Sequence, residues 1–213
     1  MCAVVAAGCS AGSGHPAASS SHPTTTPSAT TDAADVRLVQ HAVAVTAALR
    51  SYTYASTVTV AARRPVLTRI TGRVVRGHGV TYLSVTRGRR TQVIRVGTRA
   101  YVRTVPGRWG QLVHPASVVD PTASLLAVLR GLTDLRLAGA RTVHGSLPSA
   151  VASTARIPTD GRPADVSVTV DAGGHVLALD VSTSTSVGAR SVTVTAVTSY
   201  ATFDRAAAIK PPF

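Results

Sequence analysis

The segment Tyr52-Thr53-Tyr54-Ala55-Ser56-Thr57-Val58-Thr59-Val60 alternates between two kinds of side chain. This period of two residues is typical of a β-strand, with Tyr52, Tyr54, Val58 and Val60 on one face and threonines on the other. Five such runs lie between Ser51 and Val105, separated by short breaks at 62–65, 77–79, 88–90 and 97–98. A parallel crossover needs a dozen or more residues, so the breaks predict a five-stranded antiparallel meander.

Two amphipathic segments predict helices outside the meander. From Asp35 to Arg50, Leu38 and other apolar residues recur at helical spacing. The second helix begins at Asp120-Pro121, where Asp is a favoured N-cap and Pro a favoured first residue, and it ends at Gly131. This second segment is short and very apolar, so we expect it to cover part of the sheet.

The last third of the chain returns to strand patterns. Short runs are expected at 135–138, 141–144, 166–170, 176–181 and 191–200, with a tight turn over Asp171-Ala172-Gly173-Gly174. These elements predict an α+β fold, in which a strongly curved antiparallel sheet forms a half-barrel and helices pack across its concave face.

The concave face of such a half-barrel is either a packed core or the wall of an apolar cavity. Its inner positions are mainly small residues, which favours a cavity. We expect the cavity to be closed by the second helix, with Trp109 at its rim, where a headgroup would bind. The predicted lining is Tyr52, Tyr54, Val58, Val60, Val66, Ile70, Ile94, Val96, Leu125, Leu126 and Leu129.

The charge is strongly one-sided. The chain has 21 Arg, one Lys, nine Asp and no Glu, and the twelve arginines between Arg63 and Arg108 have no acidic residue among them. Arginines on an outer sheet face can simply maintain solubility and block edge pairing. They can also bind an anionic partner, either nucleic acid or an acidic membrane surface. The residues expected to face a membrane are Arg69, Arg73, Arg87, Arg89, Arg90, Arg95 and Arg103.

The N-terminus indicates export. Residues 1–9 are a short apolar run ending in Ala6-Ala7-Gly8-Cys9, which resembles a bacterial lipobox in which the cysteine takes lipid. Residues 10–34 are rich in Ser, Thr, Ala and Pro and are expected to form a disordered tether. The sequence therefore predicts a signal segment over 1–9, a tether over 10–34 and one domain over 35–213, anchored outside the cytoplasm through Cys9.

Motifs for catalysis are absent from the sequence. It contains no G-x-S-x-G, H-E-x-x-H or C-x-x-C, and its histidines have no metal-binding partner at useful spacing. With no Glu, acid–base chemistry would depend on Asp and His alone. We expect a binding protein without a metal or cofactor, monomeric rather than oligomeric.

The order of these parts resembles a known group. The lipobox and tether are followed by a helix, a long meander and the spaced residues Tyr101, Gly107 and Trp109. After these come Asp120-Pro121, the hairpin at 171–174 and a final strand that leads into Ile209-Lys210-Pro211-Pro212. This layout resembles the LppX/LprG-type lipoproteins of actinobacterial envelopes, within the LolA-like half-barrel class. The resemblance implies a cavity that binds acyl chains of envelope lipids or lipoproteins and helps to move them.

Two other functions are compatible with parts of the pattern. The same half-barrel can be an envelope sensor or protein-interaction module, which a cavity too small for an acyl chain would favour. Nucleic-acid binding fits the charge, but it lacks stacking aromatics among the arginines and conflicts with export, so no nucleic-acid partner is expected.

Overall fold

The computed structural model describes residues 33–115, 118–187, 190–205 and 207–213. Cys9, the predicted signal segment and nearly all of the predicted tether lie outside these residues. In chain order the elements are α1 (Ala33–Ala48), β1 (Ser51–Ala61), β2 (Val66–Val75), β3 (Gly79–Thr86), β4 (Arg89–Val96), β5 (Arg99–Val105), β6 (Gly110–Gln111), α2 (Pro121–Gly131), β7 (Thr133–Gly139), β8 (Thr142–Leu147), α3 (Ser149–Thr154), β9 (Ala164–Val170), β10 (Val176–Val187) and β11 (Arg190–Ala201).

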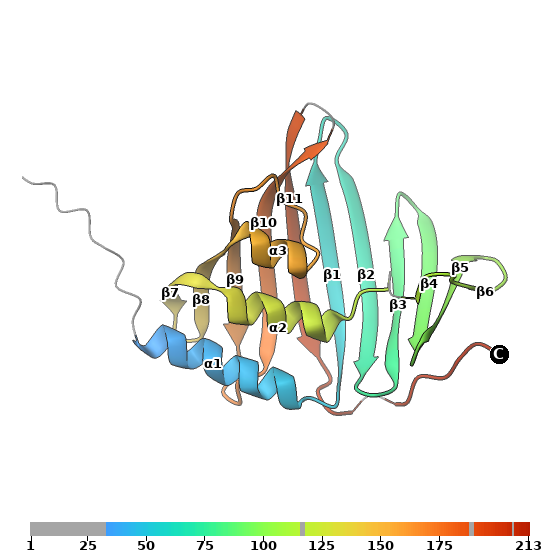
Figure 1. The fold of residues 1–213 in the computed structure, drawn as a ribbon, viewed down its shortest axis with the longest axis horizontal. Helices are drawn as coiled ribbons and strands as arrows, with labels where there is room; N and C mark the ends of the chain where they lie inside the picture. The colour runs from blue at the N-terminus through green and yellow to red at the C-terminus, as the bar shows by residue number, and fades with distance from the viewer. Residues whose placement is uncertain (1–32, 116–117, 188–189, 206) are drawn as a thin grey trace, which may run out of the picture.

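The strands form a single antiparallel sheet of 11 strands in the order β6-β5-β4-β3-β2-β1-β11-β10-β9-β8-β7. The five-stranded meander predicted over 51–105 is confirmed as β1 to β5. The first strand, β1, also pairs along most of its length with the last strand, β11. This pairing joins the early and late meanders into one sheet, which is curved but not closed (Figure 1).

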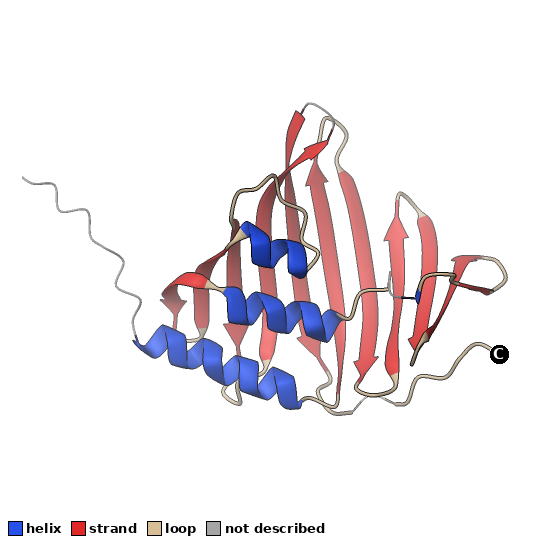
Figure 2. Cartoon of the chain, in the orientation of Figure 1, coloured by secondary structure: helices blue, strands red, loops and turns tan. Residues whose placement is uncertain are grey.

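All three helices lie on the same face of the sheet (Figures 1 and 2). The predicted cap of α2 is confirmed, because the Asp120 carboxylate accepts hydrogen bonds from the backbone N–H groups of Thr122 and Ala123. Apolar residues of α2, among them Leu125 and Val128, pack with α3 and with the inner side chains of β9 and β10. The predicted α+β half-barrel with helices across its concave face is therefore confirmed.

The short helix α3 was not predicted. It spans six residues after Pro148, and Ala152 is its buried residue. A segment of Ser, Ala and Thr with so few large apolar residues gives no helical stripe, and packing against α2 rather than its own sequence stabilises it.

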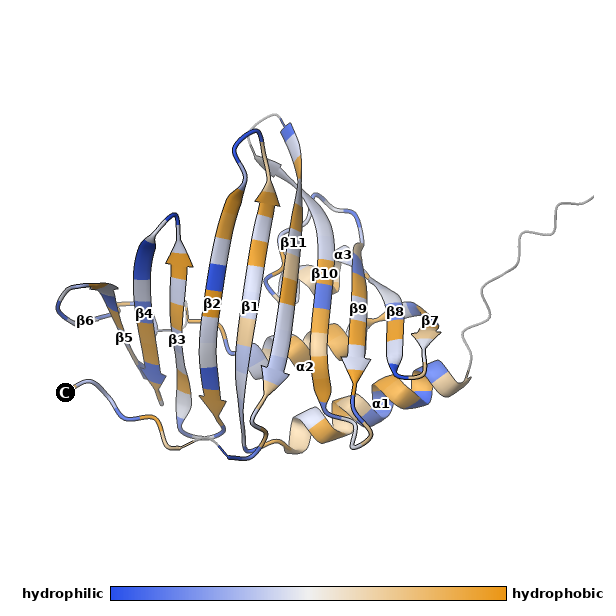
Figure 3. Ribbon diagram, turned by 180° about the vertical axis from the view of Figure 1, so that it is seen from behind, coloured by the Kyte–Doolittle hydropathy of each residue, from blue (hydrophilic) through white to orange (hydrophobic). Residues whose placement is uncertain are grey.

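A second apolar cluster occupies the concave face of the β1–β5 half. It contains Leu49, Tyr52, Val74 and Val80. The view from behind shows the opposite, convex face of the sheet with no helix over it (Figure 3). The two clusters leave a space between them at the middle of the concave face.

Turn length decides which residues of each strand point inward. The β2–β3 turn leaves three residues between Val75 and Gly79, so even-numbered residues face inward in both strands. The β3–β4 turn leaves only two, between Thr86 and Arg89, so odd-numbered residues face inward in β4. The β4–β5 turn, also of two residues, restores the even positions in β5. A change of one residue in a turn reverses the face of every side chain in the following strand.

Candidate functional site

A cavity of about 700 Å³ lies between the middle of the concave face and the helices. Its floor comes from β1 to β4, β10 and β11, and its roof from α2 and the segment 155–158 after α3. The lining consists of Tyr54, Ser56, Val58, Ile70, Tyr82, Ser84, Thr91, Val93, Val119, Pro121, Ser124, Leu125, Val128, Ala155, Arg156, Ile157, Pro158, Leu179, Val181, Thr183, Val194, Ala196, Thr198 and Tyr200.

A row of tyrosines crosses the floor at one level. Strand pairing places Tyr82, Gly72, Tyr54 and Tyr200 in direct register on β3, β2, β1 and β11. The absence of a side chain at Gly72 is required here, because a Cβ atom would lie 2.6 Å from the Tyr54 ring. Gly72 therefore lets the Tyr54 ring lie close to the sheet, which leaves the space above it open.

The next row toward the β1–β2 turn also carries hydroxyl groups. Thr91, Ser84, Ser56 and Thr198 lie in register there, with Ile70 between the two serines. The Thr198 hydroxyl donates to Ser56 Oγ at 2.9 Å. Together with the tyrosine row, these residues form what we call the hydroxyl band: Tyr54, Ser56, Tyr82, Ser84, Thr91, Thr198 and Tyr200.

The hydroxyl band is uncharged. Burial raises the pKa of Tyr54, Tyr82 and Tyr200 above the ordinary value of 10.0, so their phenols stay protonated at neutral pH. The rest of the lining is largely aliphatic, and Arg156 is the one charged residue among the described residues that line the cavity. A ligand that fits this surface is mainly apolar and has neutral groups that can hydrogen-bond.

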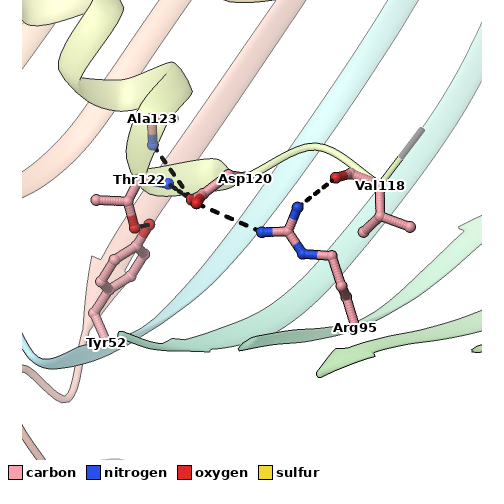
Figure 4. Close-up of polar contacts among 6 residues, drawn as sticks. All are labelled: Tyr52, Arg95, Val118, Asp120, Thr122 and Ala123. Carbon is pink, nitrogen blue, oxygen red and sulfur yellow. Dashed lines mark hydrogen bonds and ion pairs between the residues drawn. The ribbon is translucent and has the colours of Figure 1, made fainter. Parts of the chain in front are cut away.

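Polar contacts at its N-terminus tie the roof helix to the floor (Figure 4). The Arg95 guanidinium donates to the Val118 carbonyl at 3.0 Å and lies 3.5 Å from the Asp120 carboxylate. The Tyr52 hydroxyl lies within hydrogen-bonding distance of Thr122 Oγ1, at 3.1 Å. The prediction that Arg95 faces a membrane is therefore wrong, because the two-residue β3–β4 turn points this side chain inward, where it positions α2.

Four of the predicted lining residues border the cavity: Tyr54, Val58, Ile70 and Leu125. Three others share the concave face but lie outside the lining. Tyr52 is buried beneath the start of α2, while Val60 pairs with Val66 nearer the β1–β2 turn. All three follow the strand alternation, but the helices cover only part of that face.

The other predicted lining residues do not reach the cavity. Ile94 and Val96 were wrongly placed, because β4 follows a two-residue turn and its inward residues are odd-numbered. In α2, Leu125 and Val128 point into the cavity. Leu126 instead borders a separate hollow beside Tyr52, and Leu129 lies in the core, where α2 packs on α1. An apolar helix gives no signal that tells its sheet-facing residues from its helix-facing ones.

Trp109 does not lie at the rim of the cavity. Its ring stacks under the Arg103 guanidinium, whose carbon lies 4.7 Å from the ring centroid. Arg103 pairs in register with Gln92 on the convex side of β4 and β5 and donates two hydrogen bonds to its amide oxygen. The Trp109 indole thus packs on the side of the sheet away from the cavity.

The remaining predicted basic residues lie on two parts of the surface. Arg69 and Arg73 project from the convex face of β2, since their neighbours Thr68 and Val74 face inward. Arg87, Arg89 and Arg90 lie at the β3–β4 turn and are exposed. Their role toward a membrane stays a prediction.

Sequence reasoning missed the part of the lining that comes from the late strands. Leu179, Val181, Thr183, Val194 and Tyr200 line the cavity from β10 and β11. Their alternation was visible in the sequence, but nothing in it indicated that β11 pairs with β1. The segment 155–158 gave no signal at all, because it has no regular structure.

Neither a metal site nor a membrane span emerges from the part of the chain that the structure describes. No group of three or more His, Cys, Asp or Glu residues is arranged there to hold an ion. Of the described helices, none is both long and apolar enough to cross a bilayer.

Comparison with solved structures identifies the fold. The chain overlaps LprF from Mycobacterium bovis with a TM-score of 0.59 at 12% identity, covering 85% of this chain and 98% of LprF. It overlaps the lipoprotein LppX from Mycobacterium tuberculosis with a TM-score of 0.53 at 13% identity, covering 84% of this chain and 100% of LppX. The chain has the fold of these two proteins. The predicted resemblance to LppX-type lipoproteins is thus confirmed at the level of fold. By sequence, no family model and no curated protein matches the chain.

Proposed function

We propose that the protein is an extracytoplasmic lipoprotein that binds acyl chains of envelope lipids or lipoproteins in its cavity and carries them. The cavity of about 700 Å³ and its mainly aliphatic lining carry this proposal. The LppX-like fold supports it. Residues 35–213 are the lipid-binding domain, 10–34 the tether and Cys9 the site of lipidation.

The size of the cavity suits an acyl chain. A volume of about 700 Å³ holds roughly 20 groups of the size of a methylene, taking about 30 Å³ for each as for water. Each buried methylene contributes about 0.8 kcal/mol. One long chain is therefore enough for tight binding without a charged contact.

Among acyl-chain ligands, the hydroxyl band favours those that carry a neutral polar group. Its protonated phenols and hydroxyls can donate to, and accept from, neutral oxygen groups such as esters and hydroxyls. They give a carboxylate or phosphate no opposite charge to pair with. A ligand that carries such a neutral group next to its hydrocarbon fits the floor better than a plain hydrocarbon does.

Native mass spectrometry of protein purified from its own membrane tests this function. We expect a mass that includes lipid on Cys9 and a second, non-covalent population of bound lipid. Treatment with mild detergent should remove the second population and leave the first.

Two results of the same experiment would count against the proposal. An unmodified Cys9 would remove the anchor. A domain that carries no lipid, and takes up none when mixed with acyl lipids, would make the fold an envelope sensor or protein-interaction module instead.

A further inference from the structure

The turns at one end of the sheet carry exposed arginines. Because consecutive antiparallel turns alternate between the two ends, the β1–β2, β3–β4 and β10–β11 turns lie at the same end. They contribute six arginines: Arg63, Arg64, Arg87, Arg89, Arg90 and Arg190.

The opposite end has a different balance of charge. It carries five arginines, Arg50, Arg76, Arg99, Arg141 and Arg205, but its β9–β10 turn begins with Asp171. Asp204 also lies there and accepts from the backbone of Ser51.

Three of the arginines form one structure, which we call the arginine tip. Arg63 and Arg64 of the β1–β2 turn and Arg190 at the start of β11 border an open hollow of about 770 Å³. All three are exposed, and no described carboxylate forms an ion pair with any of them. Asp160 and Asp165 also lie toward this end, but on the β9 side of β10.

A short run of valines on the concave face connects the cavity with the arginine tip. On the concave face, Val60 lies in register between Val66 on β2 and Val194 on β11, and Val194 itself lines the cavity. Figure 1 shows β1, β2, β10 and β11 extending past α3 at this end of the sheet. The half-buried Val60 and Val66 thus lie between the buried Val194 of the cavity and the arginines.

We propose that the arginine tip docks on an anionic bilayer, and that Val60 and Val66 form the path by which an acyl chain passes between that bilayer and the cavity. The path along Val60 and Val66 depends on the proposed function. The docking does not depend on it and is argued only from the charges of the arginine tip. Guanidinium groups pair well with phosphate oxygens, and an apolar surface beside them suits a bilayer better than a nucleic acid.

Vesicle binding of a charge-matched pair of variants tests the docking. Both variants use the full chain with Cys9→Ser, so that no anchor contributes. The tip variant is R63Q/R64Q/R190Q. The control is R99Q/R141Q/R205Q, which removes the same charge from exposed positions at the other end of the sheet. The probe is vesicles made of equal parts of phosphatidylglycerol and phosphatidylcholine, compared with phosphatidylcholine alone.

The parent protein should bind the anionic vesicles only, and rising salt should release it. Each basic residue near such a surface strengthens partitioning about fivefold, so the tip variant should bind on the order of a hundredfold more weakly. The control should stay within a few fold of the parent. An equal loss in both variants, or no loss in the tip variant, would overturn the proposal.

Lipid occupancy measured on the same variants separates the two proposals. We expect the tip variant to keep the bound lipid of its parent, because Arg63, Arg64 and Arg190 do not line the cavity. Docking without any bound lipid would reject the proposed function and keep the tip. Bound lipid without docking would reject the docking proposal and keep the proposed function.

Discussion

Replacing Val58 with tryptophan should empty the cavity of ligand while leaving the fold intact. Val58 lies at the middle of the floor, in register with the small residues Thr68 and Ala196. The indole adds about seven heavy atoms and should displace about as many methylenes of a bound chain. At about 0.8 kcal/mol each, this weakens ligand binding by about 6 kcal/mol, or roughly ten-thousandfold.

The effect on stability separates a cavity from a packed core. If the space is open, the indole fills it, and the melting temperature of the ligand-free protein should stay the same or rise. In a packed core, overpacking costs about 1–3 kcal/mol, which lowers the melting temperature of a domain of this size by about 2–12 °C.

The assay is native mass spectrometry for lipid occupancy, with calorimetry for stability. Val197→Trp is the matched control, since Val197 is also a strand valine but is exposed on the convex face of β11, outside the lining. Its occupancy should equal that of the wild type. Loss of stability in Val58→Trp, with no lipid in the wild type, would refute the reasoning and indicate a packed core.

Three further outcomes follow from the structure. Gly72→Ala places a Cβ 2.6 Å from the Tyr54 ring and 2.7 Å from the Thr81 carbonyl oxygen, so it should shift both the ring and the β2–β3 pairing and reduce lipid occupancy, as native mass spectrometry can measure. Asp120→Ala removes the cap of α2 and should lower the free energy of unfolding by about 0.5–2 kcal/mol in urea titration, against little change for Asp120→Asn. Desolvation alone would raise the pKa of Asp171, but hydrogen bonds from His175 outweigh it and hold that pKa below 3.8. The carboxylate therefore stabilises the fold above its unfolded pKa, so the stability difference between wild type and Asp171→Asn should disappear as the pH falls below about 4.

The alternating pattern of the strands was enough to predict most of the fold. Alternation over 51–105 predicted five antiparallel strands, and Asp120-Pro121 predicted the start of α2 because capping is local chemistry. Val58 and Ile70 were correctly predicted to point inward, since this prediction depended on alternation within their own strands. It failed for Ile94 because the inward face of β4 depends on the turns before that strand, and the β3–β4 turn has only two residues.

Features that depend on distant parts of the chain could not be read from the sequence. Arg95 had to be matched with Asp120, 25 positions later, before its role at the roof became visible. The tyrosine row requires the pairing of β1 with β11, which brings Tyr54 beside Tyr200. Local periodicity contains no information about such pairings, because long-range register is set by how the whole sheet packs.

Binding of straight-chain fatty alcohols of increasing length, by titration calorimetry on the full chain with Cys9→Ser, tests the central claim most directly. A cavity of about 700 Å³ that holds an acyl chain should bind each longer homologue about fourfold more tightly, until the chain reaches roughly 20 carbons. Beyond that length the affinity should stop rising. An affinity that does not depend on chain length, or no saturable binding at any length, would contradict the account.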